Sequence, residues 1–143
     1  MAKRIEIVGA GLSGLVAGIN LARQGFRVSI HEGRDYMGGD ISYADSTIMD
    51  VPAVRAELGI EVEEALEPWT ITRAWAYGKK YEFGLTRGVE GFTVERGKGE
   101  HSLENVLYRQ ARQEGVEVLL GSRLSKPEIK ELPPGSILAT GLD

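Results

Sequence analysis

Four glycines near the start of the chain place the strongest constraint on what it can fold into. They occupy positions 9, 11, 14 and 18, directly after the apolar, β-branched residues Ile5, Ile7 and Val8. Beyond them, apolar residues recur at helical spacing, and Gly25 supplies the expected stop. The sequence therefore predicts a buried strand over residues 4–8, then a glycine turn, then a helix.

Each glycine of this turn has its own physical role in such a junction. We expect Gly9 to permit a tight turn and Gly11 to let the backbone approach a pyrophosphate. Gly14 would allow close helix–strand packing, which Gly18 extends one turn further. The amides and positive dipole end of the helix would face the phosphates. The predicted phosphate-binding turn is Gly9, Ala10, Gly11, Leu12, Ser13 and Gly14.

An acidic residue follows a second predicted strand over residues 27–31. Glu32 lies about 20 residues after the glycine turn, where a carboxylate accepts hydrogen bonds from the ribose hydroxyls in this kind of fold. A carboxylate there would repel a 2′-phosphate, so NADP is disfavoured. Strand, glycines, helix, strand and acid, in this order, predict a dinucleotide site; the alternative is a glycine-rich turn with an ordinary surface glutamate.

Two further motifs distinguish between dinucleotides. The segment after the acid contains Gly33, Arg34 and the pair Gly38-Gly39, and a second motif near the far end of the chain reads Ser136-Ile137-Leu138-Ala139-Thr140-Gly141. With these motifs the chain resembles the two-dinucleotide-binding-domain flavoproteins, a superfamily that includes amine oxidases, geranylgeranyl reductases and aromatic hydroxylases. The resemblance implies FAD as cofactor. It covers residues 3–40 strongly and residues 92–142 moderately.

The resemblance also implies cofactor contacts for individual residues. The glycine pair would pass close to the cofactor phosphates, and Thr140-Gly141 would lie beside the dinucleotide. Asp40 departs from the pattern, because many relatives place arginine there; Arg34 either compensates or is a solvated surface residue. Arg96, which precedes a predicted helix, would reach towards the cofactor as in aromatic hydroxylases; the alternative is an exposed arginine.

The middle and end of the chain complete the predicted fold. Residues 51–58 should form a helix between Asp50 and Gly59, and residues 70–85 a hairpin. Further strands are expected at 92–96, 116–120 and 136–139, with a helix over 102–114 and a capped helical turn from Ser125 to Glu128. A right-handed crossover would place the strand at 116–120 beside the first strand. Residues 41–91 form a predicted substrate-side insertion whose aromatic residues either line a pocket or cover a small sheet: Trp69, Trp75, Tyr77, Tyr81 and Phe83.

These elements predict one α/β domain over residues 1–143, a Rossmann-like three-layer domain with a parallel sheet and a small antiparallel β insertion. The chain has no cysteine and two histidines, so thiol chemistry is excluded and a metal site is not expected. A net charge of −4 without a basic block disfavours nucleic acid as a partner. Neither a signal peptide nor a membrane span is visible, and we expect a cytoplasmic protein.

Three functions remain open at this point. The first is the N-terminal FAD-binding part of a flavin-dependent oxidoreductase, completed by further sequence or by a second polypeptide. The second is a free-standing, non-catalytic module that binds FAD, NAD or ADP. The third and weakest is an NAD-dependent dehydrogenase. No residue stands out as a catalytic acid, base or nucleophile, and a flavin supplies its own redox chemistry.

Overall fold

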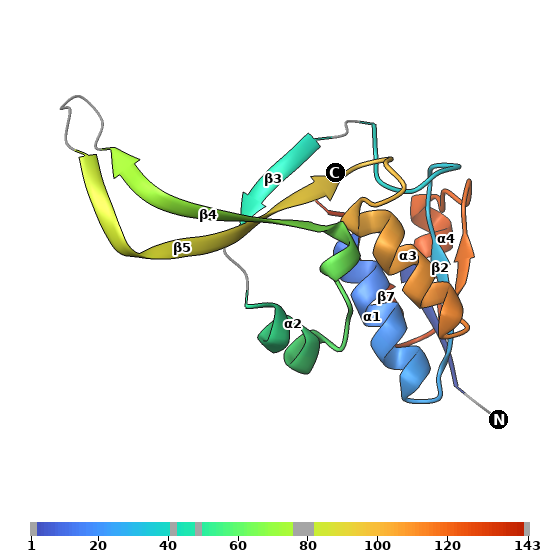
Figure 1. Ribbon diagram of the computed structural model, residues 1–143. Helices are drawn as coiled ribbons and strands as arrows, with labels where there is room; N and C mark the ends of the chain where they lie inside the picture. Colours follow the sequence, from blue (N-terminus) through green and yellow to red (C-terminus); the bar gives the residue numbers. More distant parts are fainter. Residues whose placement is uncertain (1–2, 41–42, 48–49, 76–81, 142–143) are drawn as a thin grey trace.

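A four-stranded parallel sheet forms the centre of the α/β part of the molecule (Figure 1). The computed structural model describes residues 3–40, 43–47, 50–75 and 82–141. The strands of this sheet run in the order β6-β2-β1-β7. They are β1 (Arg4–Val8), β2 (Arg27–His31), β6 (Glu117–Leu119) and β7 (Ile137–Leu138).

Two helices, α1 (Leu12–Arg23) and α3 (Leu103–Gln113), pack together on one face of this sheet. Alternation along β1 and β2 directs Ile7 and Ile30 to this face, where both are fully buried. Gly18 brings α1 close to the sheet, because a β-carbon there would lie 2.8 Å from Ile30 Cδ1. The predicted close packing at Gly18 is confirmed, and the apolar core lies between the sheet and these helices.

The opposite face of the sheet is polar and is reached by the connection that follows β6. Glu6 and Ser29 lie on this face and are buried. His31, on the same face, bonds Ser122 of the connection at 2.9 Å. Within this connection lies α4 (Lys126–Lys130), which begins with the predicted capping box of Ser125 and Glu128. Helices, sheet and connection together confirm the Rossmann-like fold class.

The strand over residues 117–119 does not lie beside β1, so that prediction was wrong. β6 pairs with β2, with Ser29 opposite Glu117, and β7 pairs with β1. A strand has only two edges, and those of β1 are taken by β2 and β7. The crossover through α3, on the same face as α1, carries the chain beyond β2 instead.

A second sheet has three antiparallel strands, and its two long strands form a hairpin that projects away from the parallel sheet (Figure 1). It contains β3 (Tyr43–Thr47), β4 (Leu66–Trp75) and β5 (Glu82–Arg96), in the order β3-β5-β4. Residues 76–81 of the predicted hairpin lie outside the described residues, and the hairpin is longer than expected, because its second strand and the strand expected at 92–96 form one strand, β5. Glycines at 84, 88 and 91 interrupt the strand-like sequence pattern, so the sequence does not indicate one continuous strand. β3 was not predicted.

The elements between β3 and β4 bring the antiparallel sheet back to the helices. The predicted helix α2 (Val51–Leu58) is confirmed with both ends: Asp50 Oδ1 accepts a 3.0 Å hydrogen bond from the Ala53 amide, and Gly59 has φ 63°. A short 3₁₀ turn, η1 (Glu63–Ala65), leads into β4. Of the predicted aromatic cluster, Trp69 is half-buried on β4, Tyr77 and Tyr81 lie outside the described residues, and the side chains of Trp75 and Phe83 are not described.

Candidate dinucleotide-binding site

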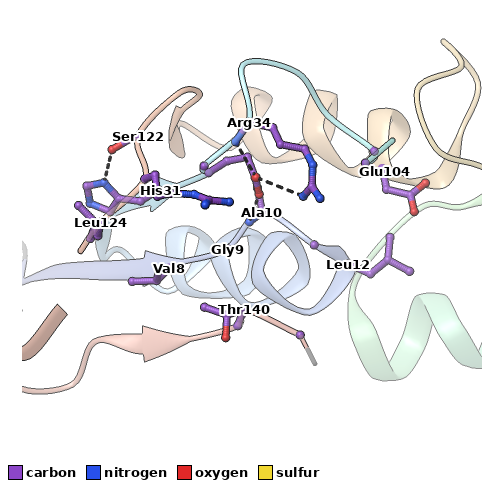
Figure 2. Close-up of a pocket in the computed structure, with 18 of the residues that line it drawn as sticks. Val8, Gly9, Ala10, Leu12, His31, Arg34, Glu104, Ser122, Leu124 and Thr140 are labelled. Atoms are coloured by element: carbon purple, nitrogen blue, oxygen red, sulfur yellow. Dashed lines mark hydrogen bonds and ion pairs between the residues drawn. The ribbon is translucent and has the colours of Figure 1, made fainter. Parts of the chain in front are cut away.

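A cleft of about 680 Å³ opens at the carboxyl ends of β1, β2 and β7 (Figure 2). This edge of a parallel sheet is where ligands bind in open α/β folds. The cleft brings together every predicted site residue except Ser13 and Gly14. The predicted residues in its lining are Gly9, Ala10, Gly11, Leu12, Glu32, Gly33, Arg34, Gly38, Gly39, Arg96, Thr140 and Gly141.

The three glycines of the turn divide into two that the fold requires and one that it does not. Gly9 has φ 102°, and a β-carbon there would lie 2.3 Å from the Ala139 carbonyl oxygen. A β-carbon on Gly14 would lie 2.0 Å from the Gly9 carbonyl oxygen. Gly11, in contrast, has φ −68°, and a β-carbon added there would meet no atom within 4 Å. The absent side chain at Gly11 therefore leaves open space in the cleft, as a bound diphosphate requires.

The amino end of α1 faces this space. Gly11 is the N-cap, no side chain caps the helix, and its first turn contains no acidic residue. The first amides of a helix have no carbonyl partner within the helix, and the helix dipole adds partial positive charge there. This end of α1 can therefore hold an anion.

Glu32 is fixed at the end of β2 by the backbone on either side of it. Its Oε2 accepts a 3.0 Å hydrogen bond from the Ala10 amide, and its Oε1 accepts one of 3.0 Å from the Arg34 amide. The side chain is 15% exposed, so the carboxylate is held in place yet reachable from the cleft. Each carboxylate oxygen can accept more than one hydrogen bond, which leaves capacity for ribose hydroxyls.

Arg34 lies between two carboxylates at the rim of the cleft. Its guanidinium is 3.9 Å from Glu32 Oε1 and 3.6 Å from Asp40 Oδ2, and the side chain is 42% exposed. The Tyr36 hydroxyl donates a hydrogen bond to Asp40 and is the largest cause of the lowered pKa of that carboxyl; Arg34 and Lys98 act in the same direction. Arg34 thus both lines the cleft and meets solvent.

Both residues of the glycine pair have positive φ, but their surroundings differ. Gly38 has φ 95°, and a β-carbon there would lie 1.8 Å from the Gly97 carbonyl oxygen. Gly39 has φ 76°, lines the cleft and has open space where a β-carbon would lie. Gly38 therefore serves packing, while Gly39 keeps the wall of the cleft close to the backbone.

Arg96 lines the cleft and is paired with the carboxylate of Glu104, which the sequence analysis did not identify. Its Nε and Nη2 lie 2.8 and 2.7 Å from Glu104 Oε1, and its Nη1 lies 3.6 Å from Asp45 Oδ2. Glu104 lies in the first turn of α3 and is buried. Helical periodicity marked Leu103 as apolar but provided no signal for its acidic neighbour, because a glutamate in a first turn is usually read as a solvated residue.

The other end of the cleft is formed by residues that sequence reasoning missed. Ser122 and Leu124 lie there beside His31 in Figure 2, and Arg123 packs over Gly33, where a β-carbon would lie 3.2 Å from the Arg123 Nε. The only sequence signal in this connection was the capping box of α4. Missed lining residues are Val8, His31, Tyr36, Glu104, Ser122, Arg123, Leu124, Lys126, Ile129 and Ala139.

Neither a metal centre nor a membrane-spanning helix is found in the part of the chain that the structure describes. Within the described residues, no group of three or more histidine, aspartate or glutamate side chains is placed to hold a metal ion. In the same part of the chain, no helix has the length and apolar character needed to cross a membrane.

Comparisons with known proteins agree with this geometry. Residues 7–68 match the family described as NAD(P)-binding Rossmann-like domain. The chain is 26% identical over 96 residues to 4,4′-diaponeurosporene oxygenase of Staphylococcus aureus (strain MRSA252), covering 67% of this chain and 17% of the relative. It is 47% identical over 47 residues to hydroxysqualene dehydroxylase of Rhodopseudomonas palustris, covering 32% of this chain and 11% of the relative.

Solved structures extend the likeness to most of the fold. CtdE in complex with FAD superposes with a TM-score of 0.53 at 20% identity, over 86% of this chain and 31% of that one. A geranylgeranyl bacteriochlorophyll reductase-like protein from Thermoplasma acidophilum gives a TM-score of 0.60 at 17% identity, over 85% of this chain and 31% of that one.

The fold and the cleft together define a Rossmann-like dinucleotide-binding protein. The chain is similar to the dinucleotide-binding part of larger proteins, and residues 7–68 carry its match to the NAD(P)-binding Rossmann-like domain family. It spans less than a fifth of the length of the two curated relatives above.

Proposed function

We propose that the cleft binds FAD and that the chain is the cofactor-binding part of a flavin-dependent oxidoreductase. The observation that carries the proposal is the open space at Gly11, which faces the uncapped amino end of α1 while Glu32 is held beside it. A flavin, when bound, supplies the redox chemistry.

The residues of the chain then have defined tasks in holding the adenosine and diphosphate half of the cofactor. The first amides of α1 bind the diphosphate, which approaches over Gly11 and Gly39. Glu32 accepts hydrogen bonds from the ribose hydroxyls and repels a 2′-phosphate. Thr140 and Gly141, at the end of β7, bound the cleft from the other side. Ser13 and Gly14 support the turn from outside the cleft.

The proposal extends to features that rest on the sequence and the relatives alone. The oxidoreductase activity, its substrate and a second polypeptide that completes the flavin site would belong to the whole protein, of which this chain matches a small share. A cytoplasmic location and residues 41–91 as a substrate-side insertion are part of the same proposal.

A second candidate is a free-standing, non-catalytic module that binds FAD, NAD or ADP. The family match favours it, because the matching family is described as NAD(P)-binding. The cleft supports it equally at the adenosine end, since FAD, NAD and ADP share the adenosine diphosphate group.

Calorimetric titration of the purified chain with FAD, ADP, NAD and NADP tests the proposal. We expect FAD and ADP to bind in preference to NADP, and we expect the protein to be colourless as purified and to bind FAD weakly. Tight, yellow binding is expected only for a longer chain or with a partner polypeptide. A clear preference for NAD would favour the second candidate, and a preference for NADP, or no binding to any of the four, would contradict the proposed site.

A further inference from the structure

A buried carboxylate joins three walls of the cleft. The side chain of Glu104 is 9% exposed and lies at the end of the cleft that is remote from Ser122 and Leu124 (Figure 2). Its Oε1 accepts from Arg96 at 2.7 to 2.8 Å, and its Oε2 accepts a 3.1 Å hydrogen bond from the Gly97 amide. Glu104 therefore ties the start of α3 to the end of β5.

The contact with Gly97 continues to the glycine pair. The Gly97 carbonyl oxygen packs directly on Gly38, where a β-carbon would lie 1.8 Å away, so the two backbones are as close as glycine permits. Gly39, the next residue, lines the cleft. The backbone of the glycine pair is thus seated on the residue whose amide Glu104 holds.

Burial of a carboxylate is costly unless it is paired and hydrogen-bonded, and a protein core is often as stable with an apolar residue in its place. An apolar residue at position 104 would satisfy the packing of α3 but could not bind the Gly97 amide and Arg96 together. The charge at Glu104 is therefore better explained by the backbone that it holds than by stability alone.

We infer that Glu104 is a positioning residue for diphosphate binding, acting through Gly97 on the glycine pair. This rests on the proposed function, because it assumes that an adenosine diphosphate group lies against Gly39. The adenosine end of the cleft, with Glu32 and Ser122, does not depend on Glu104. Loss of the carboxylate should therefore affect ligands that carry a diphosphate and spare those that carry one phosphate.

The test compares AMP, ADP and FAD by calorimetry with the parent chain and Glu104→Gln, well below the melting temperature of each. Glutamine has the same shape, but its NH2 group cannot accept a hydrogen bond, so it cannot serve both Arg96 and the Gly97 amide as the carboxylate does. We expect ADP and FAD to bind about tenfold more weakly and AMP affinity to change little. Asp45→Asn is the matched control, because Asp45 also faces Arg96, at 3.6 Å, but has no hydrogen bond to Gly97. We expect it to leave the ratio of ADP to AMP affinity at the parent value.

Each outcome decides the inference. A ratio that is unchanged in Glu104→Gln, or reduced equally in Asp45→Asn, overturns it, as does an equal loss for all three ligands. Should Glu104→Gln fail to fold, Glu104→Asp keeps the charge but shortens the reach to Gly97, and it must show the same selective loss. A parent chain that binds none of the three ligands refutes the proposed function itself, which separates that failure from a failure at Glu104.

Discussion

Two substitutions within the glycine turn should have opposite effects, although a sequence motif treats the positions alike. Gly11→Val places a branched side chain in open space at φ −68°, which valine adopts without strain. Gly14→Ala places one methyl group 2.0 Å from the Gly9 carbonyl oxygen, inside van der Waals contact with backbone that cannot move away alone. The first should remove ligand binding, and the second should remove stability.

The magnitudes follow from these positions. Valine is a poorer N-cap than glycine, so Gly11→Val should lower the free energy of unfolding by no more than about 1 kcal/mol. Its side chain would separate the diphosphate from the α1 amides; two hydrogen bonds to a charged group, at about 1.5 kcal/mol each, correspond to a loss of about hundredfold in affinity. Gly14→Ala forces the turn and α1 apart, which should cost about 1 to 3 kcal/mol or more, as overpacking of a close-packed site does.

Urea unfolding followed by circular dichroism, together with ADP calorimetry on each folded variant, measures both quantities. We expect Gly11→Val to lose ADP binding while its urea midpoint falls only slightly, and Gly14→Ala to have a clearly lower urea midpoint than the parent. Normal ADP affinity in folded Gly11→Val would refute the assignment of the open space to a diphosphate. A Gly14→Ala variant as stable as the parent would refute the role given to the contact with Gly9.

Three further perturbations test other parts of the structure. Glu32→Ala should weaken ADP binding by about tenfold or more, since each charge-assisted hydrogen bond contributes about 1.5 to 3 kcal/mol before water replaces it; calorimetry against the exposed control Glu57→Ala checks this, and equal affinity would remove Glu32 from the site. The hydrogen bond from the Ser125 hydroxyl is the largest cause of the lowered pKa of Glu128, followed by the bond from the Ser125 amide, so the carboxylate stabilises the fold above the ordinary pKa of 4.5 and this stabilisation is lost as pH falls through the lowered pKa. Glu128→Gln should therefore melt at a lower temperature than the parent at pH 7 and at the same temperature in acid. A difference in melting temperature that is independent of pH would contradict the capping role. Gly91→Ala places a β-carbon 2.3 Å from Trp69 Cη2 and 2.8 Å from the Thr47 carbonyl oxygen, so it should lower the free energy of unfolding by about 1 to 3 kcal/mol and shift the tryptophan fluorescence. An unchanged fluorescence spectrum would mean that the Trp69 ring does not cover Gly91.

The sequence determined the parts of the fold that depend on local chemistry. Residues 4–8 and 27–31 carry the apolar, β-branched side chains that buried strands need. Gly25 and Gly59 end helices because glycine adopts positive φ without strain. Asp50 and Ser125 cap helices through bonds to amides only three residues away. Order along the chain was enough to predict a Rossmann-like fold and the position of Glu32, because a strand, a glycine turn and a helix can meet a second strand in few ways.

Only the tertiary structure decided what depends on contacts between distant segments. β6 pairs with β2 because β2 and β7 occupy the two edges of β1, and nothing in the sequence of β6 itself indicates which strand it pairs with. Gly11 and Gly14 carry the same letter in the sequence, but the Gly9 carbonyl fills the space at one and nothing fills it at the other. Glu104 looked like a solvated glutamate until β5 brought Arg96 and the Gly97 amide against it. Burial and charge pairing arise from the whole chain packed in space, so a local pattern could not show them.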